Sequence, residues 1–230
     1  MTVQQKLVSW LIDYCYMLRG FFAMEIHRIP PERYRAGIPG KTAAVLIPGI
    51  LGTWAFMKDI GDRLSLAGHA VYTVPALGNN MLDIASSAKI VQSLIERENI
   101  HEAVLVTHSK GGLIGKHLLA HQGAGCVPGM VAIAAPFSGS RMARLVPLRA
   151  FRELDTESAV IHELAEERSV NDRIISIMPE YDNHVWAEQG SYLEGAQNIT
   201  VAVRGHHKVL FSPQVWDAVV KAVEEIALRK

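Results

Sequence analysis

The segment around Ser109 has the types and spacing of residues that covalent chemistry requires. An apolar run at residues 103–106 leads into Ser109, and a helical pattern begins directly behind it. A serine held in a tight strand-to-helix turn presents its hydroxyl at the end of the strand, and small neighbours let the turn form. Gly111 and Gly112 follow the serine, but Thr107 stands where a glycine is usual. The pattern favours a nucleophile; the alternative is an ordinary serine that caps a helix.

A serine hydroxyl is a weak nucleophile at neutral pH and needs a histidine base, which a carboxylate orients. Two adjacent histidines, His206 and His207, follow the last predicted strand at residues 199–203. Because adjacent side chains point in different directions, we expect only one of them to reach Ser109. We favour His206, since it directly follows Gly205 and a Gly-His turn suits this role.

Three acidic residues near the predicted strand at residues 174–178 are candidates for the orienting carboxylate. Asp172 precedes the strand, so a parallel sheet would place it at the opposite edge from Ser109. Glu180 follows the strand at once, and Asp182 lies further along the loop, where a carboxylate can reach back to an imidazole. We predict Asp182 as the acid, which gives the order serine, acid, histidine along the chain, and keep Glu180 as the alternative.

The glycine-rich loop at residues 48–52 is a candidate for stabilising the negative charge that develops on a substrate oxygen. Such stabilisation requires N–H donors that already point at the oxygen. One donor is expected from the residue after the nucleophile, Lys110, and the other from the loop after the first strand, where we select Ile50. The glycines at 49 and 52 allow the backbone to turn its amides toward a substrate; the alternative is a plain turn.

Six short apolar runs predict the strands that must position these residues. They alternate with helical patterns, which is typical of an α/β fold with a mostly parallel sheet covered by helices on both faces. The predicted strands are residues 43–47, 69–74, 103–106, 130–134, 174–178 and 199–203, and the predicted helices are 57–66, 83–97, 113–120 and 213–228. Residues 141–167 show no strand pattern, so we expect a small helical insert, either a lid or a part of the core.

Residues 1–36 precede this pattern and are predicted to form an amphipathic helical segment, with the main domain at 37–230. A wide apolar face predicts a helix packed on its own domain or on a second subunit. The alternative is contact of residues 7–24 with a membrane surface. The apolar run is interrupted by charges, which fits neither a signal peptide nor a membrane span. A narrow polar stripe is formed by Lys6, Ser9, Asp13 and Gly20.

The charge balance argues against a nucleic-acid partner. Lys plus Arg and Asp plus Glu both number 23, so the chain has no net charge to attract a polyanion. The two cysteines, Cys15 and Cys126, form neither a disulfide framework nor a metal-binding spacing. We therefore expect no metal, no organic cofactor and a cytoplasmic location, with membrane association left open.

Several segments together resemble the bacterial lipase and esterase branch of the α/β-hydrolase superfamily. They read PGILGTW, THSKGG, AAPFSGS, MPEYDNHV and GHHKVLFSPQVW, and the similarity runs from about residue 43 to the C-terminus. Two departures are Thr107 in place of the first glycine of the serine turn and Pro48 where a histidine is frequent. The resemblance implies the same roles for Ser109, Asp182 and His206, and for Ile50 and Lys110 as oxyanion donors.

The resemblance also implies hydrolysis of carboxylic esters through an acyl-enzyme, with lipid acyl esters favoured. The insert would then place apolar side chains against an acyl chain, namely Leu145, Val146, Leu148, Phe151 and Leu154. Alternatives that use the same three residues are a thioesterase, an amidase or an acyltransferase. A further alternative is a non-catalytic, membrane-associated binder that keeps the fold.

Overall fold

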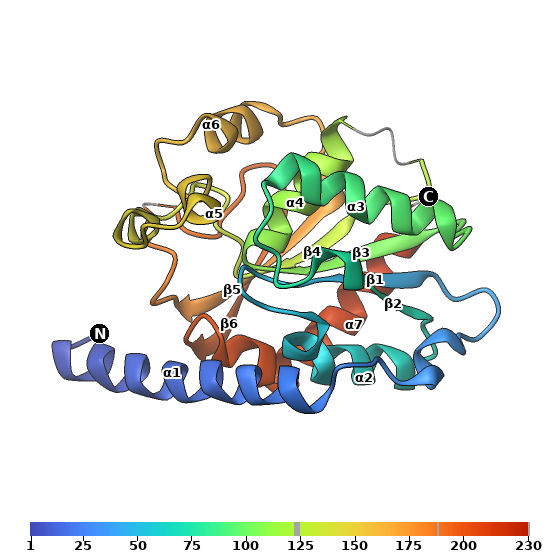
Figure 1. Cartoon of the computed structure of the whole chain (residues 1–230), viewed down its shortest axis with the longest axis horizontal. Helices are drawn as coiled ribbons and strands as arrows, with labels where there is room; N and C mark the ends of the chain where they lie inside the picture. Colours follow the sequence, from blue (N-terminus) through green and yellow to red (C-terminus); the bar gives the residue numbers. More distant parts are fainter. Residues whose placement is uncertain (122–124, 188, 230) are drawn as a thin grey trace.

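The computed structural model describes residues 1–121, 125–187 and 189–229 and contains one sheet of six parallel strands within these ranges (Figure 1). The strand order is β2-β1-β3-β4-β5-β6. Every neighbouring pair of strands is parallel. The strands are β1 Ala43–Ile47, β2 Val71–Thr73, β3 Ala103–His108, β4 Met130–Ile133, β5 Ile174–Tyr181 and β6 Gln197–Arg204.

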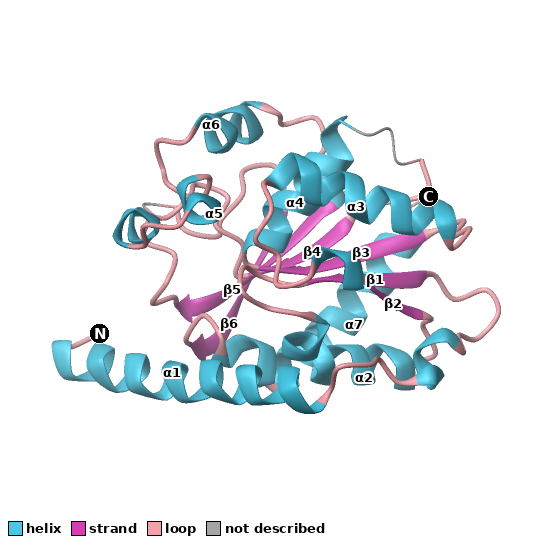
Figure 2. Cartoon of the chain, viewed as in Figure 1, coloured by secondary structure: helices cyan, strands magenta, loops and turns pink. Residues whose placement is uncertain are grey.

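Helices cover both faces of the sheet, as the α/β pattern predicts. α3 and α4 lie on one face and α2 and α7 on the other (Figure 2). The central strands are buried on both sides, which explains their continuous apolar sequences. The helices that cover the sheet are α2 Lys58–Leu66, α3 Ile84–Arg97, α4 Lys110–His121 and α7 Pro213–Leu228.

The predicted strands are confirmed, with different ends for some of them. β5 and β6 extend beyond their predicted limits, to Tyr181 and Arg204. β2 is shorter than predicted and begins at Val71. His69, predicted to lie in that strand, instead uses its Nδ1 in a hydrogen bond with the carbonyl oxygen of Thr42 at 2.7 Å.

The predicted insert at residues 141–167 contains only short helices in the structure, and its role as a lid stays a prediction. These are η4 Arg141–Leu145, α5 Arg149–Arg152 and α6 Ala159–Glu166. They lie beyond the carboxyl ends of the strands (Figure 1). Other short helices in the chain are η1 Glu32–Arg35, η2 Trp54–Met57, η3 Pro75–Leu77, η5 Asn171–Arg173 and η6 Lys208–Phe211.

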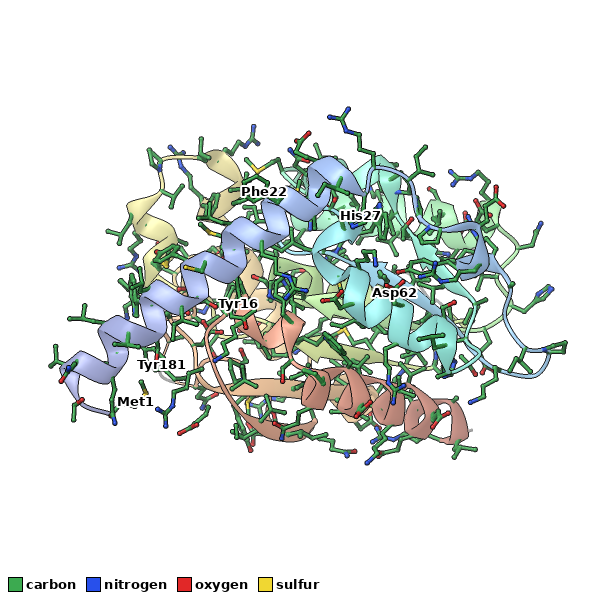
Figure 3. All side chains as sticks on the ribbon, turned by 90° about the horizontal axis from the view of Figure 1, so that it is seen from below. Met1, Tyr16, Phe22, His27, Asp62 and Tyr181 are labelled. Atoms are coloured by element: carbon green, nitrogen blue, oxygen red, sulfur yellow. The ribbon has the colours of Figure 1, made fainter. Side chains whose placement is uncertain are left out.

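The N-terminal segment forms α1 Val3–Ile26, which stretches diagonally across one side of the molecule from Met1 toward His27 (Figure 3). Its start is fixed by a capping box, in which Thr2 and Gln5 exchange side-chain to backbone hydrogen bonds. No helix among the described residues is long and apolar enough to cross a bilayer. The boundary between residues 36 and 37 stays a prediction.

α1 packs on its own domain, which is one of the two predicted packings, but much of its apolar face is exposed; packing on a second subunit stays a prediction. The polar stripe lies inward, and three of its members, Ser9, Asp13 and Gly20, are the buried residues of α1. Gly20 allows a close approach, because a Cβ at this position would lie 2.1 Å from the ring of Phe56. Asp13 forms hydrogen bonds with the domain, and Phe21 and Met24 pack against its core. Other large apolar residues of α1, namely Leu7, Leu11, Leu18 and Phe22, are exposed.

Candidate active site

Ser109 occupies the turn between β3 and α4 in a left-handed backbone conformation. Its φ is 52°, a value that residues with a side chain adopt only when the surrounding structure enforces it. The turn is held by two hydrogen bonds: the Ser109 N–H donates to the Ile133 carbonyl at 3.0 Å, and the Gly112 N–H donates to the Ser109 carbonyl at 2.9 Å. The structure thus has the tight strand-to-helix turn that the sequence predicts.

Close packing explains the small residues after the serine and the tolerance of a threonine before it. A Cβ on Gly111 would lie 2.4 Å from the carbonyl oxygen of Ile47, so glycine is needed there. Thr107 is fully buried, and its hydroxyl donates to the carbonyl of Val131 at 3.3 Å. Gly115 of α4 leaves room for the threonine methyl group, since a Cβ there would lie 3.3 Å from it.

His206 and Asp182 form a buried pair at the carboxyl edge of the sheet. The His206 Nδ1 donates to the Asp182 Oδ2 at 2.8 Å, which leaves Nε2 as the free nitrogen of the ring. The pair forms because β5 and β6 are neighbours and end together: the Gly205 N–H donates to the Tyr181 carbonyl at 2.8 Å. The buried Asn183 also accepts the His206 N–H at 3.0 Å.

Burial and charge have opposing effects on this pair. Burial lowers the pKa of His206, but the Asp182 carboxylate more than offsets it, so the pKa of His206 is raised above 6.5. Burial likewise raises the pKa of Asp182, yet attraction to His206 and three hydrogen bonds leave that pKa below its ordinary value. Two of these bonds come from the backbone N–H groups of His184 and Val185, at 2.7 and 2.9 Å.

The alternative acids lie elsewhere. Glu180 is exposed and pairs with Arg204 at 3.0 Å. Asp172 lies in η5, before β5 and therefore at the opposite edge of the sheet from Ser109. Of the three acidic candidates, Asp182 is the one that contacts a histidine at this edge.

Ser109 and His206 line the same cavity, whose volume is about 310 Å³. The walls are mainly apolar, and most of the apolar side chains come from the loop after β1, the insert and α1. Four of the five insert residues predicted to face a substrate do line it, whereas Leu145 is 69% exposed and lies outside. The apolar contributors include Ile50, Phe56, Val146, Leu148, Phe151 and Leu154, and from α1 Tyr14, Met17 and Phe21.

Solved structures with a similar backbone include several hydrolases. The mature form of Bacillus licheniformis lipase BlEst2 has a TM-score of 0.67 at 16% identity, over 81% of this chain and 94% of that chain. A monoacylglycerol lipase from Paleococcus ferrophilus has 0.60 at 16%, over 83% and 96%. An alpha/beta hydrolase fold protein from Burkholderia ambifaria has 0.63 at 15%, over 82% and 91%. This chain has the α/β-hydrolase fold.

At this low identity the likeness establishes the fold alone. No protein-family model matches the sequence, and no curated protein matches it either. In the α/β-hydrolase fold of this chain, Ser109, Asp182 and His206 follow β3, β5 and β6, and all three strands end at the same edge of the sheet.

The loop after β1 of this α/β-hydrolase fold lies beside the serine turn, because Ile47 pairs with Thr107 in the sheet. Within the described residues, the backbone N–H groups of Ile50 and Lys110 donate to no protein acceptor. The side chain of Lys110 is buried, and its Nζ donates to the carbonyls of Asn80, at 3.1 Å, and Leu82. These two hydrogen bonds form a lysine brace.

Asn80 connects this brace to the loop. Its Nδ2 donates to the Pro48 carbonyl at 2.7 Å, and it is fully buried in a left-handed conformation with φ 52°. Burial lowers the pKa of Lys110 to about 8, because the charged form of the ammonium is poorly solvated there. A chain of hydrogen bonds thus runs from Lys110 through Asn80 to the carbonyl of Pro48.

The second histidine, His207, also has a buried carboxylate partner, which sequence reasoning missed. Asp13 of α1 contacts the His207 Nδ1 through Oδ2 at 3.1 Å. Its other oxygen accepts the backbone N–H groups of His207 and Lys208, at 2.8 and 2.9 Å. The signal present in the sequence was an aspartate within the polar stripe of an otherwise apolar helix.

Two further histidines surround the pair and were not predicted. The rings of His108 and His184 lie 4.9 and 5.1 Å from that of His206, and the His108 Nε2 donates to the His206 carbonyl at 3.1 Å. Burial lowers the pKa of His108 well below its ordinary value and, with the neighbouring imidazoles, that of His184 to about 3. Both are therefore neutral neighbours of His206 at physiological pH.

Among the residues that the structure describes, two clusters have side chains of the types that bind metals. Asp13, His184 and His207 form one, and His117, His121 and Glu163 the other; in each, three ligand atoms lie within 4.8 Å of one another. The carboxylate of Asp13 already has three protein donors. The second cluster is partly exposed and lies on α4 and α6, away from Ser109.

Proposed function

We propose that this protein is a serine hydrolase that cleaves carboxylic esters, with Ser109 as nucleophile, His206 as base and Asp182 as the orienting acid. The observation that carries the proposal is the buried Asp182–His206 hydrogen bond at 2.8 Å beside a serine in a left-handed turn, within one cavity. The carboxylate fixes the tautomer in which Nδ1 carries the proton, so Nε2 is free to accept one.

The reaction proceeds in two steps through an acyl-enzyme. In the first, the Ser109 hydroxyl attacks the ester carbonyl and passes its proton to the His206 Nε2. The tetrahedral intermediate then collapses, and the alcohol leaves with that proton. In the second, His206 takes a proton from water, the hydroxide attacks the acyl-serine, and the acid is released as the serine regains its proton. These steps require no metal or organic cofactor.

The negative oxygen of each intermediate would be stabilised by the backbone N–H groups of Ile50 and Lys110. Neither group donates to another protein acceptor among the described residues, and Lys110 directly follows the nucleophile. Donors that are already oriented stabilise the transition state without reorganisation, and each contributes on the order of 100-fold or more in rate.

The substrate class that fits this cavity is an ester with an apolar acyl group. The walls are formed largely by aliphatic and aromatic side chains, with polar groups near Ser109 and the histidines. The monoacylglycerol lipase among the structural neighbours is named for a lipid substrate. A lipid acyl ester is therefore our proposed substrate.

Replacement of the nucleophile tests the proposal. Ser109→Ala should lower kcat for p-nitrophenyl esters by about 10⁵- to 10⁶-fold with an unchanged melting temperature. The wild-type protein should be labelled at Ser109 by a fluorophosphonate probe. A non-catalytic binder would not be labelled, and ester cleavage that survived the substitution would refute the assignment.

A matched series of p-nitrophenyl esters, thioesters and anilides with acyl chains of two to sixteen carbons would define the reaction further. The proposed function predicts the highest kcat/KM for the oxygen esters. Faster turnover of the thioesters would favour a thioesterase. Rapid acyl transfer to an added alcohol would favour an acyltransferase.

The outward face of α1 supports contact with a lipid surface as part of this function. The same helix lines the cavity with Tyr14, Met17 and Phe21, so one helix carries both part of the cavity wall and the exposed apolar side chains. Contact with a membrane would cover this surface and bring lipid esters to the cavity. The apolar side chains that are 53–76% exposed are Val3, Leu7, Leu11, Leu18, Phe22 and Ile26.

Co-sedimentation with phosphatidylcholine vesicles tests this contact. Leu11→Glu places a charge on the exposed face and should reduce the bound fraction severalfold. Leu66→Glu is the matched control, because Leu66 is similarly exposed, at 76% against 69%, but lies at the end of α2. Equal binding of both variants would argue against a lipid-binding face.

The exposed, free Cys15 fits our proposal of a reducing cytoplasmic location.

A further inference from the structure

A carboxylate from α1 is buried against the loop that carries His206. Asp13 is fully buried, and one of its oxygens accepts two consecutive backbone N–H groups, those of His207 and Lys208. Its other oxygen contacts the His207 ring nitrogen at 3.1 Å. A single side chain thus holds the loop at three points, although it lies 194 residues before His207 in the chain.

The loop is also shaped to accept this carboxylate. Gly205 has a φ of 129°, and a Cβ at this position would lie 2.4 Å from the Asp13 Oδ1. Any larger residue would push α1 away from the loop or turn the loop away from α1. The glycine that directly precedes His206 therefore makes room for Asp13 as well as for the turn.

Burial of a carboxylate is costly unless hydrogen bonds and charges offset the loss of hydration. An alanine on the inner face of α1 would allow helix packing without that cost. Asp13 instead has three donors, and although burial raises its pKa, the His207 and Lys208 contacts hold the pKa well below its ordinary value. The carboxylate is therefore ionised, and its three hydrogen-bond donors all belong to this loop.

We propose that Asp13 is a positioning residue for His206. It fixes the backbone of the residues that follow the histidine, and so holds the imidazole in place beside Ser109. This role rests on the proposed function of His206 as the base. Asp13 acts through the loop and contacts neither the substrate nor the nucleophile.

The Asp13 charge also acts on His206 directly. The pKa of His206 is lowered by burial and raised chiefly by Asp182, and Asp13 raises it further. Removal of the Asp13 charge should therefore shift the pKa of His206 downward, while a packing role alone would not. The titratable groups that face His206 are Asp182 and His184 from the loop after β5, His108 from the end of β3, His207 from its own loop and Asp13 from α1.

Two variants separate the hydrogen bonds of Asp13 from its charge. Asp13→Asn keeps an oxygen that can accept both backbone N–H groups but removes the charge, whereas Asp13→Ala removes both. Asp59→Asn is the matched control, because Asp59 also joins α1 to the domain, through Arg19 at 3.0 Å, without contacting the loop.

The first readout is the imidazole pKa of His206 measured by NMR, and the second is kcat for a p-nitrophenyl ester. Asp13→Asn should lower the pKa of His206 and reduce kcat about tenfold, and Asp13→Ala should reduce kcat about 100-fold, with KM nearly unchanged. Asp59→Asn should change neither value. If Asp13→Ala fails to fold, Asp13→Asn decides the question.

An unchanged pKa and kcat in Asp13→Asn together with an unchanged kcat in a folded Asp13→Ala would overturn the proposal. A shifted pKa with unchanged kcat in both variants would also overturn it, since the charge would then act without positioning. If the wild-type protein neither cleaved esters nor reacted with a fluorophosphonate, the proposed function would fail. The NMR titration would still report whether Asp13 acts on His206.

Discussion

Two adjacent histidines in this protein are each paired with a buried carboxylate, and the two pairs have similar hydrogen bonding. In each pair one carboxylate oxygen contacts a histidine Nδ1 and the other accepts two backbone N–H groups. The contact distance is 2.8 Å for Asp182–His206 and 3.1 Å for Asp13–His207. The carboxylates come from different regions: Asp182 directly follows a strand of the sheet, and Asp13 lies on the N-terminal helix.

The surroundings nevertheless give the two imidazoles opposite pKa shifts. The pKa of His206 lies above its ordinary value, because Asp182 outweighs the effect of burial. At His207, burial lowers the pKa by more than the Asp13 carboxylate raises it, and repulsion from His206 lowers that pKa further. Similar hydrogen bonds therefore fit different roles: His206 is suited to take up a proton, and His207 to remain neutral while it holds a loop.

Exchange of the two histidines for alanine, one at a time, tests this difference most strongly. His206→Ala should lower kcat by about 10⁴- to 10⁶-fold, because the base is lost. His207→Ala should lower it about tenfold, because only the contact with Asp13 is lost. Steady-state kinetics with a p-nitrophenyl ester, at matched melting temperatures, would measure both. A larger loss for His207→Ala would reverse the assignment.

The pH dependence of kcat/KM is a second test. His206 must be neutral to accept a proton, and its pKa in the folded protein is raised above 6.5. Activity should therefore be complete at alkaline pH and fall about tenfold per unit once the pH drops below that raised value. An acid limb centred below 6.5 would point instead to a histidine with a lowered pKa, such as His207. Initial rates between pH 5 and 9 would distinguish the two.

Removal of the lysine brace should have the smallest effect. Lys110→Met keeps a long side chain but loses the hydrogen bonds to Asn80 and Leu82, so the unfolding free energy should fall by about 1–3 kcal/mol. A small displacement of the loop that contains Ile50 should lower kcat about three- to tenfold. Lys116→Met is the matched control, since Lys116 is a buried lysine of the same helix. Equal losses of kcat in both variants would contradict a specific role of the brace.

The main elements of the site could be predicted from sequence because they obey local rules. Apolar runs that alternate with helical patterns define a parallel sheet, and the carboxyl ends of parallel strands meet at one edge. Ser109, Asp182 and His206 each lie just after such a strand, so their order was enough to predict their proximity. Asp182 is preferred over Glu180 because it lies further along the loop, where a carboxylate can reach back to an imidazole, and Glu180 pairs with Arg204 on the surface.

The role of the N-terminal helix was decided by tertiary structure. Helical periodicity shows which residues share a face, but the area of an apolar face does not determine which face is covered. Here the buried residues of α1 include Gly20, which approaches Phe56 closely, and Asp13, which forms hydrogen bonds, while many large apolar residues stay exposed.

The sequence by itself determined the α/β arrangement and placed a serine, an acid and a histidine at one edge of the sheet. Only the tertiary structure paired His207 with Asp13, joined Asn80 to the Pro48 carbonyl by a hydrogen bond and left much of the apolar face of α1 exposed. The physical reason is that strand and turn patterns depend on residues that are close in sequence. The hydrogen-bond donors to a buried carboxylate can instead come from any segment that the fold brings close, here 194 residues away.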